Sequence, residues 1–134
     1  MNNEEIIKKV VNQIIQEGDL EEVKKYFSTK YVAYNGNKIY KGHDFIKKWV
    51  KQIRLAIPDV KVVKIEFLNK SEKIITWQRT FKGTHKKNMR GIPASGKTIK
   101  WTEMIVSLFE NGKISEEWVV SELKGELLLK SEKK

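Results

Sequence analysis

The chain has 134 residues, of which 40% are hydrophobic and 33% are charged, so its composition is that of one globular domain and excludes a disordered chain. It has no cysteine and only two histidines, which excludes a disulfide framework and a thiolate metal site, and we expect neither a metal nor a cofactor. The net charge of +10 rests on lysine far more than on arginine, which disfavours a nucleic-acid partner because such proteins rely on the planar guanidinium group.

The chain begins with a segment whose apolar residues recur at intervals of three and four. This spacing predicts an amphipathic helix over residues 3–17. We expect Gly18 to end this helix as a C-cap. Asp19 is expected to cap a second, short helix, with Glu22 at the position that completes a capping box.

The next segment alternates between strand and helix patterns. Residues 31–34 and 39–40 are predicted to form a short hairpin around an Asn-Gly-Asn turn. A third helix is expected after Gly42, running to about Ile57. Pro58 stops it because proline disfavours helical geometry at the preceding residue.

From about residue 60 the hydrophobic period becomes two, which is typical of strands. The residues after the last strand, 123–129, are apolar and compatible with a helix, and 130–134 form a charged tail that we expect to fray. A long excursion over residues 84–97 contains two glycines and a proline. The expected strands cover residues 60–68, 73–82, 98–110 and 113–122.

Helices first and an antiparallel meander afterwards indicate an α+β fold in one domain covering residues 1–134. No apolar run approaches the roughly 20 residues that a membrane span requires. The first residues lack the features of a signal peptide, so we expect a cytoplasmic protein with no membrane partner.

Three of the expected strands mix charged and apolar residues on one face. Such a charge is costly unless it is paired or hydrated. Two interpretations remain open: an edge, a bulge or a cross-strand Arg79–Glu103 pair, or the wall of a wet cavity in which polar groups orient an apolar ligand. The faces in question are Ile75, Trp77, Arg79 and Phe81; Ile99, Trp101, Glu103, Ile105 and Phe109; and Ile114, Glu116, Trp118, Val120 and Glu122.

Several short motifs occur together in a recognisable order. With them, nearly the whole chain resembles the SnoaL-like polyketide cyclases of the nuclear-transport-factor-2-like (cystatin-like) group. This resemblance implies a curved, mainly antiparallel sheet that forms a cone around an internal pocket, an apolar small-molecule ligand and a homodimer. The motifs are Gly18-Asp19-Leu20, residues 56–62 around Pro58-Asp59, Gly83-Thr84-His85, Gly91-Ile92-Pro93-Ala94-Ser95-Gly96-Lys97, residues 109–114 around Asn111-Gly112, and Glu117-Trp118.

The resemblance also implies candidate site residues. An acidic residue four positions after the tryptophan of the last strand acts as general acid/base in this family, and Glu122 has that position here. His85 corresponds to the family histidine and is a candidate donor to a ligand carbonyl or enolate. The candidate ligand-binding residues are Trp49, Trp77, Arg79, Trp101, Glu103 and Trp118.

Each of these residues also has a structural explanation. Glu122 could be a solvent-facing residue at the start of the last helix, His85 a loop residue, and most of the tryptophans simply core. The residues after His85, Lys86-Lys87-Asn88-Met89, and Gln78 depart from the family pattern.

Two functions therefore remain open. The first is an enzyme of cyclase or isomerase type that acts on an apolar carbonyl compound with a pocket carboxylate. The alternative is a module of the same fold that binds a small molecule or mediates dimerisation without catalysis. Nucleic-acid binding is the least favoured, since only the net charge supports it.

Overall fold

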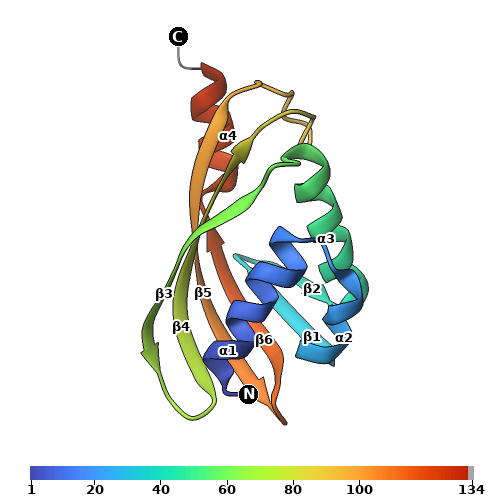
Figure 1. The fold of residues 1–134 in the computed structure, drawn as a ribbon, viewed down its shortest axis with the longest axis vertical. Helices are drawn as coiled ribbons and strands as arrows, with labels where there is room; N and C mark the ends of the chain where they lie inside the picture. Colours follow the sequence, from blue (N-terminus) through green and yellow to red (C-terminus); the bar gives the residue numbers. More distant parts are fainter. Residues whose placement is uncertain (133–134) are drawn as a thin grey trace.

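The computed structural model describes residues 1–132, with side chains described as far as residue 128. The α+β class is confirmed (Figure 1). The helical elements are α1 (Asn3–Lys9), η1 (Val10–Gln16), η2 (Leu20–Glu22), α2 (Val23–Tyr26), α3 (Gly42–Ala56) and α4 (Leu123–Glu132). The strands are β1 (Phe27–Asn35), β2 (Lys38–Lys41), β3 (Lys61–Lys70), β4 (Ile74–Thr84), β5 (Thr98–Glu110) and β6 (Lys113–Ser121).

The six strands form one sheet in the order β2-β1-β6-β5-β4-β3. Strands β3 to β6 form the expected antiparallel meander, whereas β1 pairs with β6 in parallel. The sheet is strongly curved, and α1, η1 and α3 lie across its concave side (Figure 1). This arrangement is the predicted mainly antiparallel, curved sheet covered by N-terminal helices.

The first predicted helix, residues 3–17, consists of two parts. A capping box starts it: the Asn2 side chain accepts from the Glu5 N–H at 2.8 Å, and the Glu5 carboxylate accepts from the Asn2 N–H at 3.0 Å. After Lys9 the chain continues as a π-helix, η1, whose wider turn the apolar spacing does not reveal. The far end is anchored by Arg54 of α3, which donates to the Gln16 carbonyl.

The turn after η1 is predicted correctly in one respect and wrongly in another. Gly18 has a positive φ of 75°, as expected for a C-cap. Asp19, however, makes no side-chain capping bond, and the predicted capping box with Glu22 is absent. The chain instead forms one 3₁₀ turn, η2, before α2 begins at Val23, and the Glu22 carboxylate accepts from Lys25 at 3.0 Å.

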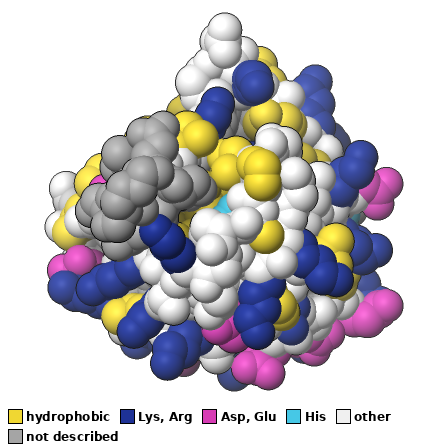
Figure 2. All heavy atoms as spheres, turned by 90° about the horizontal axis from the view of Figure 1, so that it is seen from above, with side chains coloured by type: hydrophobic (Ala, Val, Ile, Leu, Met, Phe, Trp, Pro, Cys, Tyr) yellow, Lys and Arg dark blue, Asp and Glu magenta, His cyan; other side chains and the backbone are white. Residues whose placement is uncertain are grey.

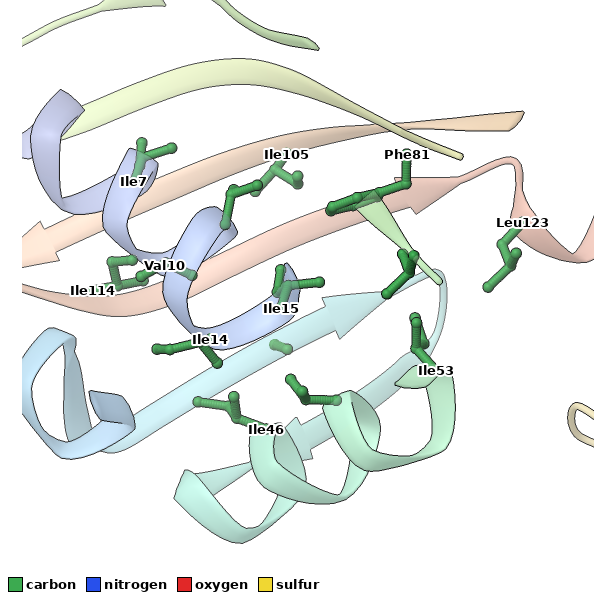
Figure 3. Packing of buried hydrophobic residues seen from close by; sticks show 14 of the residues in the cluster. Ile7, Val10, Ile14, Ile15, Ile46, Ile53, Phe81, Ile105, Ile114 and Leu123 are labelled. Carbon is green, nitrogen blue, oxygen red and sulfur yellow. The ribbon is translucent and has the colours of Figure 1, made fainter. Parts of the chain in front are cut away.

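The hydrophobic core lies between the concave face of the sheet and the helices. In Figure 3, Ile7, Val10, Ile14 and Ile15 point from α1 and η1 toward the sheet and toward α3. The amphipathic patterns of the two long helical segments therefore place their apolar sides against one core. Buried residues of this core include Ile46, Val50 and Ile53 of α3, Phe81 of β4, Ile99 and Ile105 of β5, and Ile114 of β6.

Two of the motifs that carry the family resemblance have structural roles at the end of α3. A Cβ atom at Gly83 would lie 2.2 Å from Ile57 Cγ2, so β4 can pass this close to the end of α3 only with glycine. Asp59 accepts from both the backbone N–H and the hydroxyl of Thr84, each at 2.7 Å. These contacts fix the start of the long β4–β5 connection.

A β-bulge interrupts the pairing of β5 with β6. Phe109 pairs with Ile114, but its neighbour Leu108 pairs with Glu116, so Ser115 is the extra residue. The Ser115 hydroxyl donates to the Leu108 carbonyl at 3.2 Å. One extra residue reverses which side chains face the core, because strand side chains alternate with a period of two. The predicted face of β6 is therefore wrong beyond Ile114: the inward residues are Glu117, Val119 and Ser121, and the outward ones are Glu116, Trp118, Val120 and Glu122.

The chain ends in α4, where the predicted helix over 123–129 is confirmed and extends to Glu132. The predicted tail over 130–134 thus overlaps α4, and its last two residues lie outside the described ones. None of the helices in residues 1–132 has the length and apolar character needed to cross a bilayer.

Candidate functional site

A cavity of about 1070 Å³ lies inside the curve of the sheet. Its walls come from η1, β1, the β1–β2 hairpin, α3, the inward faces of β4 to β6, the β4–β5 connection and α4. Figure 2 looks onto the end of the molecule where α4 and the β4–β5 connection lie, and shows hydrophobic side chains gathered near the middle of this face, with Lys and Arg side chains around them.

The first polar group in the cavity wall spans three neighbouring strands. Arg79 of β4, Glu103 of β5 and Ser121 of β6 lie opposite one another in the sheet register. Arg79 Nε donates to Glu103 Oε1 at 2.7 Å, and the Ser121 hydroxyl donates to Glu103 Oε2 at 2.6 Å. Both charged side chains are almost fully buried, with 8% and 3% exposed. Both carboxylate oxygens of Glu103 are thus satisfied within the protein.

Aromatic rings surround the guanidinium group of Arg79. Its Cζ lies 5.4 Å from the ring centroid of Trp49, 5.4 Å from that of Trp77 and 5.6 Å from that of Phe81. Such cation–π contacts hold a desolvated guanidinium in place. Arg79 is therefore a fixed positive charge in the cavity wall.

The second polar group is centred on Glu117 of β6. The Tyr31 hydroxyl donates to Glu117 Oε1 at 2.7 Å, and the Ser107 hydroxyl donates to Oε2 at 2.6 Å. Behind them, the Trp77 indole N–H donates to the Ser107 oxygen at 2.9 Å. The result is a chain of hydrogen bonds from β4 through β5 and β6 to β1.

Burial changes the acid–base properties of this group. Desolvation raises the pKa of Glu117, although the charge of Arg79 and the hydrogen bonds from Ser107 and Tyr31 lower it in part. Burial, followed by the neighbouring Glu117 carboxylate, raises the pKa of Tyr31 well above its usual value. A carboxyl group with a raised pKa in a cavity is suited to taking a proton from a ligand and returning it.

Of the eight site residues proposed from the sequence, three line this cavity: Trp49, Arg79 and Glu103. Trp77 and Trp101 are buried in the core and are not part of the cavity lining. Trp77 still contributes indirectly through its hydrogen bond to Ser107. The structure thus supports the cavity interpretation of the charged strand faces, and Arg79 and Glu103 are also the cross-strand pair that was the alternative explanation.

Glu122 and Trp118 lie elsewhere. Glu122 is exposed, and its Oε1 accepts from the Thr102 backbone N–H at 2.9 Å. Trp118 is 42% exposed and stacks on Tyr34 with ring centroids 5.2 Å apart. Both follow the bulge at Ser115, which turns them to the outer face, so the expectation that they line the pocket is wrong.

His85 is completely buried beneath the β4–β5 connection and does not line the cavity. Its Nδ1 lies 3.4 Å from the Ser95 hydroxyl, and its Nε2 has no partner among the described residues. Its backbone pairs with Lys97 and Gly96 on the other side of the connection. These two backbone hydrogen bonds join the start of the connection to its end. The expectation that His85 faces a ligand in this cavity is not met.

The sequence interpretation missed Tyr31, Ser107, Glu117 and Ser121. Two of them, Glu117 and Ser121, were assigned to the outer face because the bulge was not foreseen. Ser107 lies on the predicted inward face of its strand, two residues after Ile105, so alternation alone could have found it. Tyr31 lies in the predicted strand, but nothing in the sequence indicates that it faces a glutamate 86 residues away.

The fold and the cavity together define a class of protein: an open α+β cone with ionisable groups in an otherwise largely apolar interior. Among the described residues, no group of three or more histidine, aspartate or glutamate side chains is arranged to hold a metal ion. The polar side chains that line this cavity include carboxyl, guanidinium, hydroxyl and indole groups.

The family model for SnoaL-like polyketide cyclases matches residues 5–127, which is nearly the whole chain. The chain belongs to the SnoaL-like polyketide cyclase family. No curated protein matches the sequence significantly.

Solved structures share the fold at low sequence identity. A candidate SnoaL-like polyketide cyclase from Jannaschia sp. CCS1 superposes with a TM-score of 0.85 at 15% identity, covering 98% of this chain and 93% of the other. A candidate polyketide cyclase from Acidithiobacillus ferrooxidans gives 0.79 at 24% identity, covering 96% of both chains. AclR from Streptomyces galilaeus, a candidate hydroxylase, gives 0.81 at 21% identity, covering 96% of this chain and 79% of AclR. At these identities the likeness defines the fold.

Proposed function

We propose that the protein is an enzyme that binds an apolar carbonyl compound in the cavity and uses Glu117 as its general acid/base. The observation that carries the proposal is the Glu117 carboxyl group, which is buried in the cavity wall and has a raised pKa. Family membership supports a small-molecule reaction of cyclase type. Glu117 takes the catalytic role that the sequence interpretation gave to Glu122.

The reaction begins with proton abstraction next to a carbonyl group. The Glu117 carboxylate takes a proton from the carbon adjacent to the carbonyl, and the electron pair of the C–H bond moves into an enolate. In an aldol-type ring closure, the enolate carbon then forms a C–C bond to a second carbonyl carbon of the same molecule. The resulting alkoxide takes the proton back from Glu117, so the acid/base group is regenerated.

The neighbouring groups suit this chemistry. Arg79 is a fixed cation in the cavity wall, close enough to Glu117 to lower its pKa, and a fixed cation stabilises the negative charge of an enolate oxygen. Tyr31 and Ser107 hold the Glu117 carboxyl group in one orientation. Glu103 keeps Arg79 in position and neutralises its charge in part.

A model ketone tests the proposal without knowledge of the natural substrate. 2-Tetralone is apolar and has protons next to its carbonyl, and their exchange for deuterium in heavy water can be followed by NMR. We expect the protein to accelerate this exchange and Glu117→Gln to lower the rate at least about 100-fold. Glu122→Gln is the matched control and should leave the rate unchanged. If Glu122→Gln abolishes exchange and Glu117→Gln does not, the acid/base assignment is wrong.

One observation favours the alternative of a binding module without catalysis. Both oxygens of Glu117 and both oxygens of Glu103 already accept hydrogen bonds from the protein, which suits a structural role. A ligand that raises the unfolding temperature of both the wild type and Glu117→Gln, with no exchange or turnover by either, would support this alternative.

We also propose that the protein is a homodimer that pairs through the outer face of the sheet. Exposed apolar side chains gather there on β5 and β6: Met104 is 45%, Trp118 42% and Val120 74% exposed. Val120→Lys should convert a species of twice 15.7 kDa into one of 15.7 kDa in light scattering. Leu55→Lys, which changes an apolar residue on α3 that is 62% exposed, should not. A wild type that is monomeric at all concentrations would overturn the proposal.

The cytoplasmic location, the single domain and the lack of a cofactor remain predictions from the sequence.

A further inference from the structure

We call the exposed lining residues of the cavity its mouth. The mouth carries mainly positive charge, whereas the interior carries more carboxyl groups than cations. The exposed lining residues include five cations: Lys38 and Lys41 of β2, Lys48 of α3, Arg90 of the β4–β5 connection and Lys124 of α4. Among the residues whose side chains the structure describes, Asp44 is the only acidic one in the exposed lining. Within the described part of the chain, none of the five cations forms an ion pair.

These cations come from four separate segments of the chain. Lys41 and Lys48 flank the first half of α3, while Arg90 and Lys124 approach from the β4–β5 connection and from α4. Lysines spread evenly over a basic surface would be accompanied by their share of carboxylates, and the whole chain has 27 basic against 17 acidic residues. A ratio of five to one at the mouth exceeds this average.

In the interior of the cavity, carboxyl groups outnumber cations. Two carboxyl groups, Glu103 and Glu117, face one cation, Arg79, and that cation already pairs with Glu103. Proton transfer from the ligand to Glu117 leaves the total charge of the interior unchanged. A head group that brings its own negative charge deep into the cavity would instead add to these carboxylates in a low dielectric, which is unfavourable. The same group at the mouth would meet only Asp44 and five cations.

From this charge distribution we infer that the ligand is an anionic amphiphile, whose apolar, carbonyl-bearing body enters the cavity and whose acidic head group stays at the basic mouth. The inference rests on the proposed apolar cavity and adds the class of ligand and its orientation. The head group is a carboxylate, sulfate or phosphate, since each gives the mouth the negative charge that it lacks. In this orientation the reacting carbonyl faces Glu117, and the head group remains hydrated.

Two fluorescent probes isolate the head group. 1-Anilinonaphthalene-8-sulfonate and N-phenyl-1-naphthylamine share one ring system and differ only in the sulfonate. We expect the sulfonate probe to bind about tenfold more tightly at about 0.01 M salt, where the screening length is roughly 30 Å. At about 1 M salt, where that length is roughly 3 Å, the two affinities should converge to within about twofold.

Charge reversal at the mouth gives the second test. The double variant Lys48→Glu/Lys124→Glu should lower the affinity for the sulfonate probe about tenfold at low salt and leave the neutral probe within about twofold. The matched control is Lys82→Glu/Lys100→Glu, which makes the same change in net charge at an exposed pair that faces across β4 and β5 and does not line the cavity. It should affect neither probe by more than about twofold.

The outcomes separate this inference from the proposed function. If both probes bind equally well and the mouth variant changes neither, the cavity takes apolar ligands without a preference for anions, and the inference is overturned while the pocket remains. If the control variant weakens the sulfonate probe as much as the mouth variant does, the effect belongs to the net charge, and the inference is again overturned. If neither probe binds, the apolar cavity of the proposed function fails, and the inference fails with it.

Discussion

Two tyrosine–glutamate pairs join β1 to β6, one on each face of the sheet. On the inner face, Tyr31 donates to Glu117 at 2.7 Å, and on the outer face, Tyr34 donates to the adjacent Glu116 at 2.8 Å. The donors, acceptors, strands and distances are nearly the same. Their surroundings differ, since Tyr31 and Glu117 are buried in the cavity wall, whereas Tyr34 and Glu116 are only partly covered.

The comparison separates the effect of the hydrogen bond from the effect of burial. Burial is the largest cause of the raised pKa of Tyr31, and the hydrogen bond to Glu116 is the largest cause for Tyr34. In the inner pair, desolvation is the largest cause of the raised pKa of both Tyr31 and Glu117, and a desolvated carboxyl group with a raised pKa is suited to acid/base chemistry. The face of the sheet, rather than the residue type, decides which glutamate lies in the cavity wall, where the proposed function requires it.

The largest expected effect on stability concerns the inner ion pair. Arg79→Met leaves the Glu103 carboxylate buried without its cation, and we expect the free energy of unfolding to fall by about 3–5 kcal/mol. Lys64→Met breaks the exposed Lys64–Glu66 pair and should change the free energy of unfolding little. Urea unfolding of both variants measures the difference. Equal effects of the two substitutions would contradict the claim that the buried ion pair contributes more to stability than the exposed one.

The two tyrosines give the next largest effect. Tyr31→Phe removes one of the two donors to a buried carboxylate, so we expect a loss of about 1–3 kcal/mol in the free energy of unfolding. Tyr34→Phe should cost less than half as much, because water replaces the lost hydroxyl at Glu116. Urea unfolding at neutral pH measures both, and a larger loss for Tyr34→Phe would refute the account.

A smaller effect is expected in the pH dependence of stability. The folded state holds a proton on Glu117 more tightly than the unfolded state does, because its folded pKa is raised above the ordinary 4.5. The contribution of this group to stability is therefore lost as the pH rises from about 4.5 through the raised pKa, and is constant above it. Glu117→Gln removes this loss, so the variant should gain stability relative to the wild type as the pH rises through that window.

The comparable substitution on the outer face is Glu116→Gln. Urea unfolding of both variants and the wild type at several pH values from 4.5 upward provides the test. A difference between wild type and Glu117→Gln that does not change with pH would mean that burial does not perturb this carboxyl group.

The sequence predicted the elements of the fold well, because each has its own local pattern. The apolar spacing of residues 3–17, the Asn111-Gly112 hairpin and Pro58 after α3 all reflect short-range constraints. The errors concern the first two helices. Asp19 does not cap the second helix, and the first helix widens into a π-helix after Lys9, for which the apolar spacing gives no indication.

The candidate site was predicted in part. Alternation placed Arg79 and Glu103 correctly because β4 and β5 pair in one register over their whole length. On β6, alternation put Glu122 on the same face as Ile114 and Glu117 on the other, which holds only if the strand is unbroken. The catalytic role of Glu122 came from the family resemblance. The bulge at Ser115 depends on the pairing of β6 with β5, and its residue type does not reveal it.

The measurement that tests the central claim most directly is a titration of the glutamate side-chain carboxyl groups by carbon-13 NMR, with the Glu117 resonance assigned by its absence from Glu117→Gln. The account predicts that this resonance titrates above the ordinary value of 4.5, and that Tyr31→Phe moves its pKa further upward by removing a donor to the carboxylate. A Glu117 resonance that titrates at or below 4.5 in the wild type would show a well-solvated or fully compensated carboxylate and would contradict the account.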